Sequence, residues 1–318
     1  PTDVVWVMLS GGTSSLIGAP NAAMSIAELA DLNEVLLASG IDIAAMNIIR
    51  KRVSRWGGGR LALALEPAQV RVFGISDVPG NDLAALGSGP LVPDETTTQD
   101  VRALLRMKGL WMRVPAVVRE LLMRDGETSE TPKADNPAFR HVKTAIVASN
   151  ATAVNAALQR ASALGYRASL ANAPLSGAAA AAGRELVREL LDAAASGVAV
   201  CLVSGGETVV DLTDRPPNAK GGRSQELALA AAAVLARGGA NQRLALLAAG
   251  TDGRDGPTDA AGALVTPATW GAIAAAGRDP ERDLLAHDAY RALDAAGALL
   301  RTGASGTNVM DIAIAAAR

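Results

Sequence analysis

The chain of 318 residues has little of the chemistry that several kinds of site require. Its single cysteine, Cys201, excludes an internal disulfide framework and a thiolate zinc site. The two histidines, His141 and His287, are too few for a three-histidine metal site and disfavour a Ser-His-Asp triad. No partner residues lie near either one in the sequence, so we assign neither a role. Aromatic residues make up only 3%, so the core must come from Ala, Leu, Val and Ile.

Charge of one sign and long hydrophobic runs are also lacking. The 30 Lys and Arg residues against 32 Asp and Glu residues give a net charge of −2, which disfavours a nucleic-acid partner. No apolar run approaches the ~18 residues that a membrane span needs. No signal peptide is visible either, so we expect no membrane association and a cytoplasmic location. Residue 1 is Pro and a strand pattern opens at Val4, so we expect upstream sequence to be missing.

Short apolar runs, each followed by small or polar residues, alternate with longer Ala- and Leu-rich segments. The runs predict strands at Val4–Leu9, Val70–Ile75, Ala145–Ala148, Ala199–Val203 and Leu244–Ala249. The longer segments predict helices at Ser25–Ser39, Ala151–Leu164 and Gln225–Ala236. This alternation is typical of an α/β fold with mostly parallel sheets flanked by helices. The polar segment Met123–His141 predicts a linker, so we divide the chain into domains 1–138 and 139–318.

Glycine-rich turns at strand ends are the first candidate binding sites, because bare N–H groups in such turns can form an anion-binding nest. The first such turn contains Ser10, Gly11, Gly12 and Ser14 and could hold a phosphate or a carboxylate. A second strand ends in the same way at Ser204, Gly205 and Gly206. The alternative is a tight turn without a ligand.

A second candidate lies at the start of a predicted helix. Gly221 and Gly222 precede Arg223, and Ser224 suits the N-cap of the helix that follows. A guanidinium at the positive end of a helix dipole is a good site for a multiply charged anion such as triphosphate. The alternative is an ordinary capped helix with a solvated arginine.

A Gly-rich loop directly after an apolar strand contains three carboxylates within a span of eight residues: Asp252, Asp255 and Asp259. Such a cluster repels itself unless a cation balances it, so it predicts a Mg²⁺ or proton-transfer loop. The spacing of an EF-hand fails, since its twelfth position, counted from Asp252, is Ala263. A polar turn is the alternative.

Other segments carry weaker signals. Asp77 stands just past a predicted strand, and the basic cluster in Asn47–Arg60 is expected to be structural. A late Gly-rich turn, Thr302–Asn308, could close over a ligand, and Cys201 is expected to be a buried small hydrophobe. These candidates together suit Mg²⁺-assisted phosphoryl transfer, because they combine anion-binding nests, one guanidinium and several carboxylates, with no histidine base.

The motifs together resemble the class II glycerate kinases, whose chains end in a MOFRL domain and some of which are labelled hydroxypyruvate reductase. The most specific motif is the run Thr-Asp-Gly-x-Asp-Gly-Pro-Thr-Asp-Ala-Ala-Gly in Thr251–Gly262. The other matching segments are Leu9–Leu16, Asn47–Arg60, Ser76–Pro93, Ser149–Asn150, Ser204–Thr208, Gly221–Glu226 and Thr302–Asp311.

This resemblance implies ATP- and Mg²⁺-dependent phosphorylation of D-glycerate, most often to 2-phosphoglycerate. It also implies a Rossmann-like N-terminal domain, a C-terminal domain with the MOFRL region, and an active-site cleft between them. The matching motifs imply that three residues are catalytic: Asp77, Arg223 and Asp252. Arg223 would neutralise the transferring phosphate, and Asp252 and Asp77 would divide metal binding and hydroxyl orientation between them. The residues of the two nests would bind the cofactor or substrate, together with Gly221, Gly222 and Asn308. Asp255 would join Asp252 at the metal.

The chain departs from the family pattern in three places. The family has an upstream Rossmann-like stretch with a lysine in a Gly-Lys-Ala-type motif, which this sequence lacks. In the basic segment, the family usually has Lys where Gly57 stands and His where Arg52 stands. In the first nest, it commonly has a third Gly where Thr13 stands. Two alternatives stay open: an NAD(P)H-dependent hydroxypyruvate reductase, and a truncated chain that binds nucleotide or glycerate without turnover. A homodimer also stays open.

Overall fold

The computed structural model describes residues 3–13, 17–124, 130–213, 215–238 and 243–318. Its contacts divide the chain into two compact units, Pro1–Val147 and Ala148–Arg318. The sequence placed the boundary after residue 138. The contact boundary lies later because strand β3, Val142–Ala148, belongs to the sheet of the first unit.

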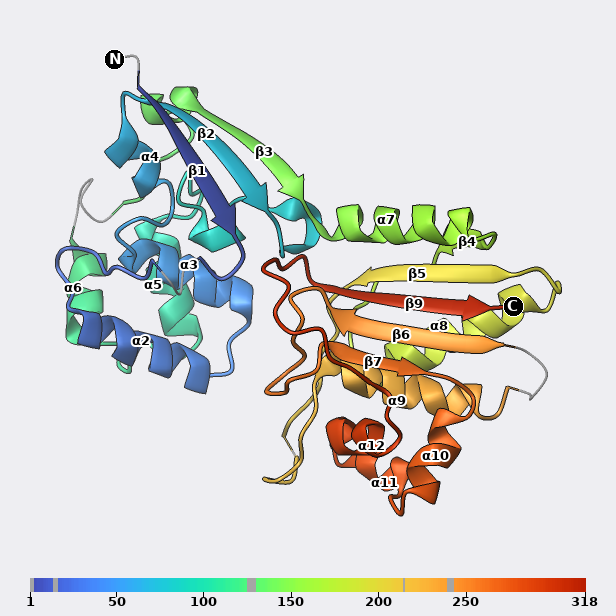
Figure 1. Cartoon of the computed structure of the whole chain (residues 1–318). Helices are drawn as coiled ribbons and strands as arrows, with labels where there is room; N and C mark the ends of the chain where they lie inside the picture. The colour runs from blue at the N-terminus through green and yellow to red at the C-terminus, as the bar shows by residue number, and fades with distance from the viewer. Residues whose placement is uncertain (1–2, 14–16, 125–129, 214, 239–242) are drawn as a thin grey trace. The chain divides into compact units, whose positions relative to one another are not determined.

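The first unit combines a three-stranded sheet with a group of helices (Figure 1). Its elements in chain order are β1 (Val4–Ser10), α2 (Ile26–Ala38), α3 (Ile43–Val53), α4 (Arg60–Leu65), β2 (Gln69–Ile75), η1 (Pro79–Asn81), η2 (Leu86–Ser88), α5 (Thr98–Met107), α6 (Ala116–Met123), η3 (Pro137–His141) and β3. Strands β1 and β2 pair in parallel, with Ser10 opposite Ile75. One apolar cluster packs around this sheet, and a second one fills the space among α2, α3, α5 and α6.

The predicted helix at residues 25–39 shows how the sequence specifies such an element. Ser25 caps α2, and Ser25 and Glu28 form a reciprocal capping box. Leu32 and Leu36, one turn apart, are completely buried in the helical cluster. Burying one such side chain contributes about 1.5–3 kcal/mol.

The second unit is a six-stranded sheet with helices on its faces (Figure 1). Its elements are α7 (Asn150–Ala163), β4 (Arg167–Leu170), α8 (Ala179–Ala194), β5 (Val200–Gly206), α9 (Arg223–Leu235), β6 (Leu244–Gly250), β7 (Gly262–Val265), α10 (Thr269–Ala275), α11 (Pro280–Leu285), α12 (Ala289–Ala295), β8 (Leu299–Leu300) and β9 (Asp311–Ala317). The strand order is β4-β5-β9-β6-β7-β8, and only β4 and β5 pair in parallel. The α/β class is confirmed, but this sheet is mixed rather than mostly parallel.

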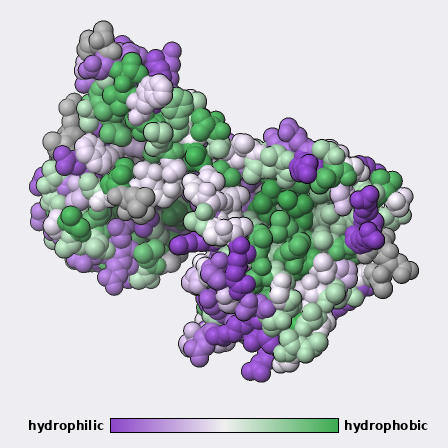
Figure 2. All heavy atoms as spheres, viewed as in Figure 1, coloured by the Kyte–Doolittle hydropathy of each residue, from purple (hydrophilic) through white to green (hydrophobic). Residues whose placement is uncertain are grey.

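Alternation along the strands assigns the two faces of this sheet. Leu202 and Ala315 lie in the cluster with α8 and α9, whereas Val203 and Ile314 lie in the cluster with α7. Cys201 also faces α7 and is 3% exposed, which confirms the expected buried hydrophobe. Figure 2 shows hydrophobic residues gathered over the sheet of this unit. Within the described residues, no helix is both long and apolar enough to cross a bilayer.

Strand β9 fixes where functional groups can meet in the second unit. It lies between β5 and β6 and is antiparallel to both. Its first residue, Asp311, therefore stands opposite Gly206 and Gly250, the last residues of β5 and β6. A carboxylate from the end of the chain thus lies at the edge where the sequence predicts ligand binding.

Candidate active site

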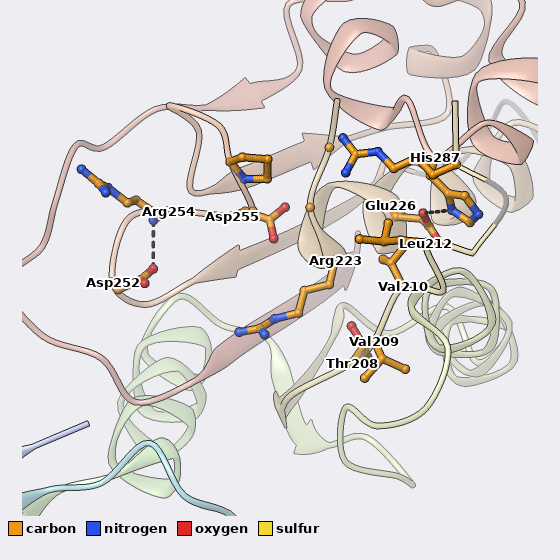
Figure 3. A pocket seen from close by; sticks show the side chains of 15 residues that line it. Thr208, Val209, Val210, Leu212, Arg223, Glu226, Asp252, Arg254, Asp255 and His287 are labelled. Atoms are coloured by element: carbon orange, nitrogen blue, oxygen red, sulfur yellow. Dashed lines mark hydrogen bonds and ion pairs between the residues drawn. The ribbon is translucent and has the colours of Figure 1, made fainter. Parts of the chain in front are cut away.

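A cavity of about 520 Å³ in the second unit brings several predicted site residues together. Gly221, Gly222 and Arg223 from the start of α9 line it, as do Asp252 and Asp255 from the loop after β6. The remaining lining residues are Thr208, Val209, Val210, Leu212, Arg215, Glu226, Arg254, Gly256, Pro257 and His287. Figure 3 shows the Arg223 side chain extending toward the side of Asp252 and Arg254.

The Arg223 guanidinium is held by two carboxylates that the sequence did not single out. Nη2 donates to Asp311 Oδ1 at 3.1 Å, Nε donates to Asp311 Oδ2, and Nη1 donates to Glu207. Burial lowers the pKa of Arg223, but the hydrogen bonds and charge of Asp311 outweigh it, so the pKa is raised overall. Two of its five N–H groups have no partner among the described residues and can serve an anion.

Asp255 caps α9 from a loop thirty residues away in sequence. Its carboxylate accepts the backbone N–H of Ser224 at 3.1 Å and of Gln225 at 2.7 Å. The helix therefore begins at Arg223 with Gly222 as N-cap, and the expectation that Ser224 caps it is wrong. Burial raises the pKa of Asp255 to about 6, against the lowering effect of the two N–H groups. With both oxygens engaged and 3% exposure, we assign Asp255 to capping rather than to metal binding.

Asp252 keeps one oxygen available to a ligand. Oδ1 accepts the backbone N–H of Arg254 at 2.9 Å, and no described residue bonds to Oδ2. Ser305 supports the loop, since its N–H donates to the Asp252 carbonyl at 3.0 Å and its hydroxyl donates to the Thr251 carbonyl at 2.6 Å. Asn308 does not line the cavity, and its Oδ1 accepts the backbone N–H of Met310. The late Gly-rich turn thus packs on the Asp252 loop.

The cavity also contains a pair formed by a histidine and a glutamate, which the sequence interpretation missed. His287 Nδ1 lies 2.7 Å from Glu226 Oε2, and the Glu226 side chain is 7% exposed. His141 also has a side-chain neighbour, since its Nδ1 lies 3.1 Å from Gln69 Nε2, and both partners are far from their histidines in sequence. Glu226 follows Arg223 by three residues and so shares its helix face, a signal that was available. The residues around His287 in the sequence give no sign that its side chain contacts α9.

The second predicted nest has a packing role. The Ser204 hydroxyl donates to the Ala173 carbonyl at 2.9 Å inside the unit. A Cβ at Gly205 would lie 2.0 Å from Asn150 Oδ1, and one at Gly206, with φ +140°, would lie 2.3 Å from the Leu175 carbonyl oxygen. Close backbone approach thus requires both glycines. None of the three residues lines the cavity.

The first predicted nest lies beside Asp77 in the first unit. A Cβ at Gly11 would lie 1.7 Å from Asp77 Oδ2, so this glycine allows the carboxylate to contact the turn after β1. Ser10 and Gly12 are exposed, and Asp77 is half-buried. The structure therefore brings two of the predicted features together. Ser14 lies outside the described residues.

Two residues of the basic cluster in the first unit, Lys51 and Arg52, are buried, which fits the structural role expected of them. Arg52 is completely buried, and its Nη1 lies 2.8 Å from Glu130 Oε2. Arg60 Nη1 donates to the carbonyls of Lys51 and Ser54. Burial is the main cause that lowers the pKa of Arg60, to about 10. The cluster is thus not the solvated face that a run of charges usually forms.

Two family models match the chain. The model described as "Domain of unknown function (DUF4147)" matches residues 1–123, and the model "MOFRL family" matches residues 200–311. The chain is 37% identical to "Glycerate 2-kinase" of Pyrococcus horikoshii, over 98% of this chain and 70% of that protein. It is 39% identical to "Putative hydroxypyruvate reductase" of Agrobacterium vitis, over 98% of this chain and 69% of that protein. A crystal structure of glycerate kinase from Thermotoga maritima superposes with a TM-score of 0.85 at 36% identity, over 98% of this chain and 72% of that one.

Proposed function

We propose, since the chain belongs to the glycerate kinase family that carries a MOFRL domain, that it transfers the γ-phosphoryl group of ATP to D-glycerate and forms 2-phosphoglycerate. Family membership identifies the chain as a kinase. The observation that carries the proposal is that Arg223 and Asp252, predicted separately from motifs 29 positions apart, line one cavity.

Three arginines give the cavity its affinity for a polyphosphate. Arg215, Arg223 and Arg254 line it, and a guanidinium fork matches the geometry of phosphate oxygens. Asp311 and Glu207 fix the Arg223 guanidinium, so little side-chain entropy is lost when a phosphate binds. Such a preorganised cation stabilises the charge that spreads over the transferring group.

The cavity also fits a divalent cation that arrives with the nucleotide. Mg²⁺ is usually held by one or two carboxylates together with substrate phosphates. The described residues contain no cluster of three or more His, Cys, Asp or Glu side chains able to hold a metal alone. Asp252 Oδ2 is available for this role, and when bound the ion would neutralise charge on the phosphates.

The acceptor hydroxyl needs a group that orients it or accepts its proton. Asp77, beside the Gly11 turn, is our candidate for this task, and Asp252 is the candidate for the metal. The motifs also allow the reverse assignment. In either case these two carboxylates divide the work, while Asp255 holds the start of α9 in place.

A coupled assay of ADP release with D-glycerate tests the proposal. We expect ADP formation that requires D-glycerate, ATP and Mg²⁺ together. The name of the Agrobacterium relative, "Putative hydroxypyruvate reductase", favours a second candidate, reduction of hydroxypyruvate. Loss of NADH absorbance with hydroxypyruvate in the absence of ATP would support that candidate. ATP binding without product would identify a chain that binds nucleotide only.

A further inference from the structure

A second pocket, of about 320 Å³, lies in the first unit and is not used by any of the roles above. Four polar residues line it: Asn33 from α2, Arg50 from α3, Ser54 at the C-cap of α3, and Ser88 at the end of η2. Its other walls are apolar and come from Gly18, Ala19, Ile26, Leu29 and Ala30. A single cation in a small, otherwise neutral pocket suits a small anion.

Arg50 lacks a counter-charge among the residues that the structure describes. Its Nε donates to Asn33 Oδ1 at 2.9 Å, and its two terminal nitrogens make no hydrogen bond or ion pair there. Arg52, on the same helix, instead pairs with Glu130. Burial lowers the pKa of Arg50, as expected for a partly desolvated cation without a carboxylate nearby. Binding an anion would offset that cost.

Asn33 holds the guanidinium ready for a ligand. Its Nδ2 donates to the Leu29 carbonyl at 2.9 Å, which turns Oδ1 toward Arg50 Nε. One edge of the guanidinium is thus anchored, and the two terminal nitrogens together offer the parallel donors that a carboxylate accepts. A fixed fork loses little freedom when it binds.

Two hydroxyl groups complete the pocket. Ser54 Oγ accepts the backbone N–H of Trp56 and of Gly57, so its own proton is available to a ligand. Ser88 has φ +66°, a left-handed conformation that is uncommon for a residue with a side chain. Such strain is concentrated at functional sites. Among the residues that the structure describes, neither hydroxyl donates a hydrogen bond, so both can donate to a ligand oxygen in the pocket.

The pocket belongs to the same region as the first nest. A Cβ at Gly87 would lie 3.4 Å from Thr13 Cβ, so η2, which carries Ser88, packs on the turn after β1. That turn also contacts Asp77 through Gly11. The candidate proton acceptor and the Arg50 pocket are therefore connected through directly contacting segments.

We propose that Arg50 binds the carboxylate of the small hydroxy acid substrate, with Ser54 and Ser88 bonding to its oxygens; this inference rests on the proposed function. A three-carbon acid fits the pocket, and the carboxylate is the group that distinguishes it from a neutral polyol. Arg50 thereby determines specificity for an acid over an alcohol such as glycerol.

The test is calorimetric titration of the full chain with D-glycerate and with glycerol, together with steady-state kinetics. Arg50→Met should weaken D-glycerate binding and raise its KM at least tenfold, and leave the KM for ATP unchanged. Arg50→Lys should restore part of the affinity. Arg55→Met is the matched control, because Arg55 is exposed and does not line the pocket. Ser88→Gly, which relieves the left-handed strain, should fold at least as well and still bind D-glycerate several-fold more weakly.

The outcomes separate this inference from the proposed function. Turnover of D-glycerate with both binding and KM unchanged in Arg50→Met would overturn the pocket and leave the kinase assignment intact. Arg50-dependent binding of D-glycerate without any phosphorylation would support the pocket and overturn the proposed function. Arg50-dependent binding that leaves the KM for D-glycerate unchanged would identify an effector site and overturn the substrate assignment.

Discussion

The carboxylate of Asp255 accepts the backbone N–H of Gln225 at 2.7 Å, so the loop after β6 caps the helix that carries Arg223. Two segments that the sequence separates by thirty residues are thereby fixed to each other at the cavity. Asp255 acts through Arg223 rather than on a ligand, which makes it a positioning residue.

This cap predicts an unusual pH dependence of stability. Because burial raises the pKa of Asp255 to about 6, the folded chain binds more protons than the unfolded chain between the ordinary value of 3.8 and about 6. Its contribution to the free energy of unfolding therefore falls as the pH rises through that window, by up to about 3 kcal/mol. Asp255→Asn cannot titrate, so we expect the stability of this variant relative to wild type to improve as pH rises, measured by urea unfolding.

Asp259→Asn is the control for the Asp255 experiment. Asp259 is an exposed carboxylate of the same loop, and hydrogen bonds from Tyr290 and Arg301 lower its pKa. Its contribution is therefore present above its ordinary pKa and is lost as pH falls, opposite in sign to Asp255. A stability difference for Asp255→Asn that does not change with pH would contradict the buried cap.

Arg223 should carry most of the charge stabilisation in the cavity. Arg223→Ala should lower kcat/KM by about 10²–10³-fold, the typical cost of removing one preorganised electrostatic group. Arg223→Lys should recover only part, since an ammonium lacks the fork that Asp311 holds. Arg237→Ala is the matched control, because Arg237 is exposed and lies just past the C-terminal end of the same helix. Near-normal turnover in folded Arg223→Ala would show that this role is wrong.

Glu130 should stabilise the first unit by neutralising buried Arg52. Burial by itself would raise the pKa of Glu130. The hydrogen bonds from Thr98 and the charge of Arg52 outweigh this effect and lower the pKa from 4.5 to about 2. Its contribution is present above the ordinary value of 4.5 and is lost as pH falls toward about 2. Glu130→Gln should cost toward the low end of the ~3–5 kcal/mol for breaking a buried pair, because Glu130 is itself partly exposed. An unchanged denaturation midpoint at neutral pH would argue against this pairing.

Cys201 should be unreactive in the folded chain. It is 3% exposed in β5, and burial raises the pKa of its thiol, so little thiolate is present to react. We expect labelling by a thiol reagent only at the rate at which the strand opens, and rapid labelling in urea. Fast stoichiometric labelling without denaturant would contradict the packing of the α7 face.

The sequence predicted those parts of the fold that local pattern determines. Apolar runs followed by small or polar residues identified the cores of β1, β2, β5 and β6, and the period of the apolar residues in 25–39 identified α2. Strand β9 was missed because four of the seven residues in its Asp-Ile-Ala-Ile-Ala-Ala-Ala run are Ala, which favours helices over strands. Its insertion between β5 and β6 depends on pairing across the whole unit.

The same division applies to the site. Arg223, Asp252 and their shared cavity were predictable because Gly-rich loops at strand ends gather at one sheet edge. Asp311 and His287 were not, since each reaches the cavity from a segment far away in sequence. The start of α9 was misplaced by two residues for the same reason, because its cap comes from Asp255 and not from Ser224.

The most direct test of the account is phosphorus NMR of the full chain incubated with ATP, Mg²⁺ and D-glycerate. The account predicts that the γ-phosphate signal of ATP decreases while a phosphomonoester signal appears that couples to the proton on carbon 2 of glycerate. Arg223→Ala should form this product at a greatly reduced rate. An unchanged ATP spectrum with correctly folded wild-type chain, or transfer to water alone, would contradict the assignment of glycerate kinase activity.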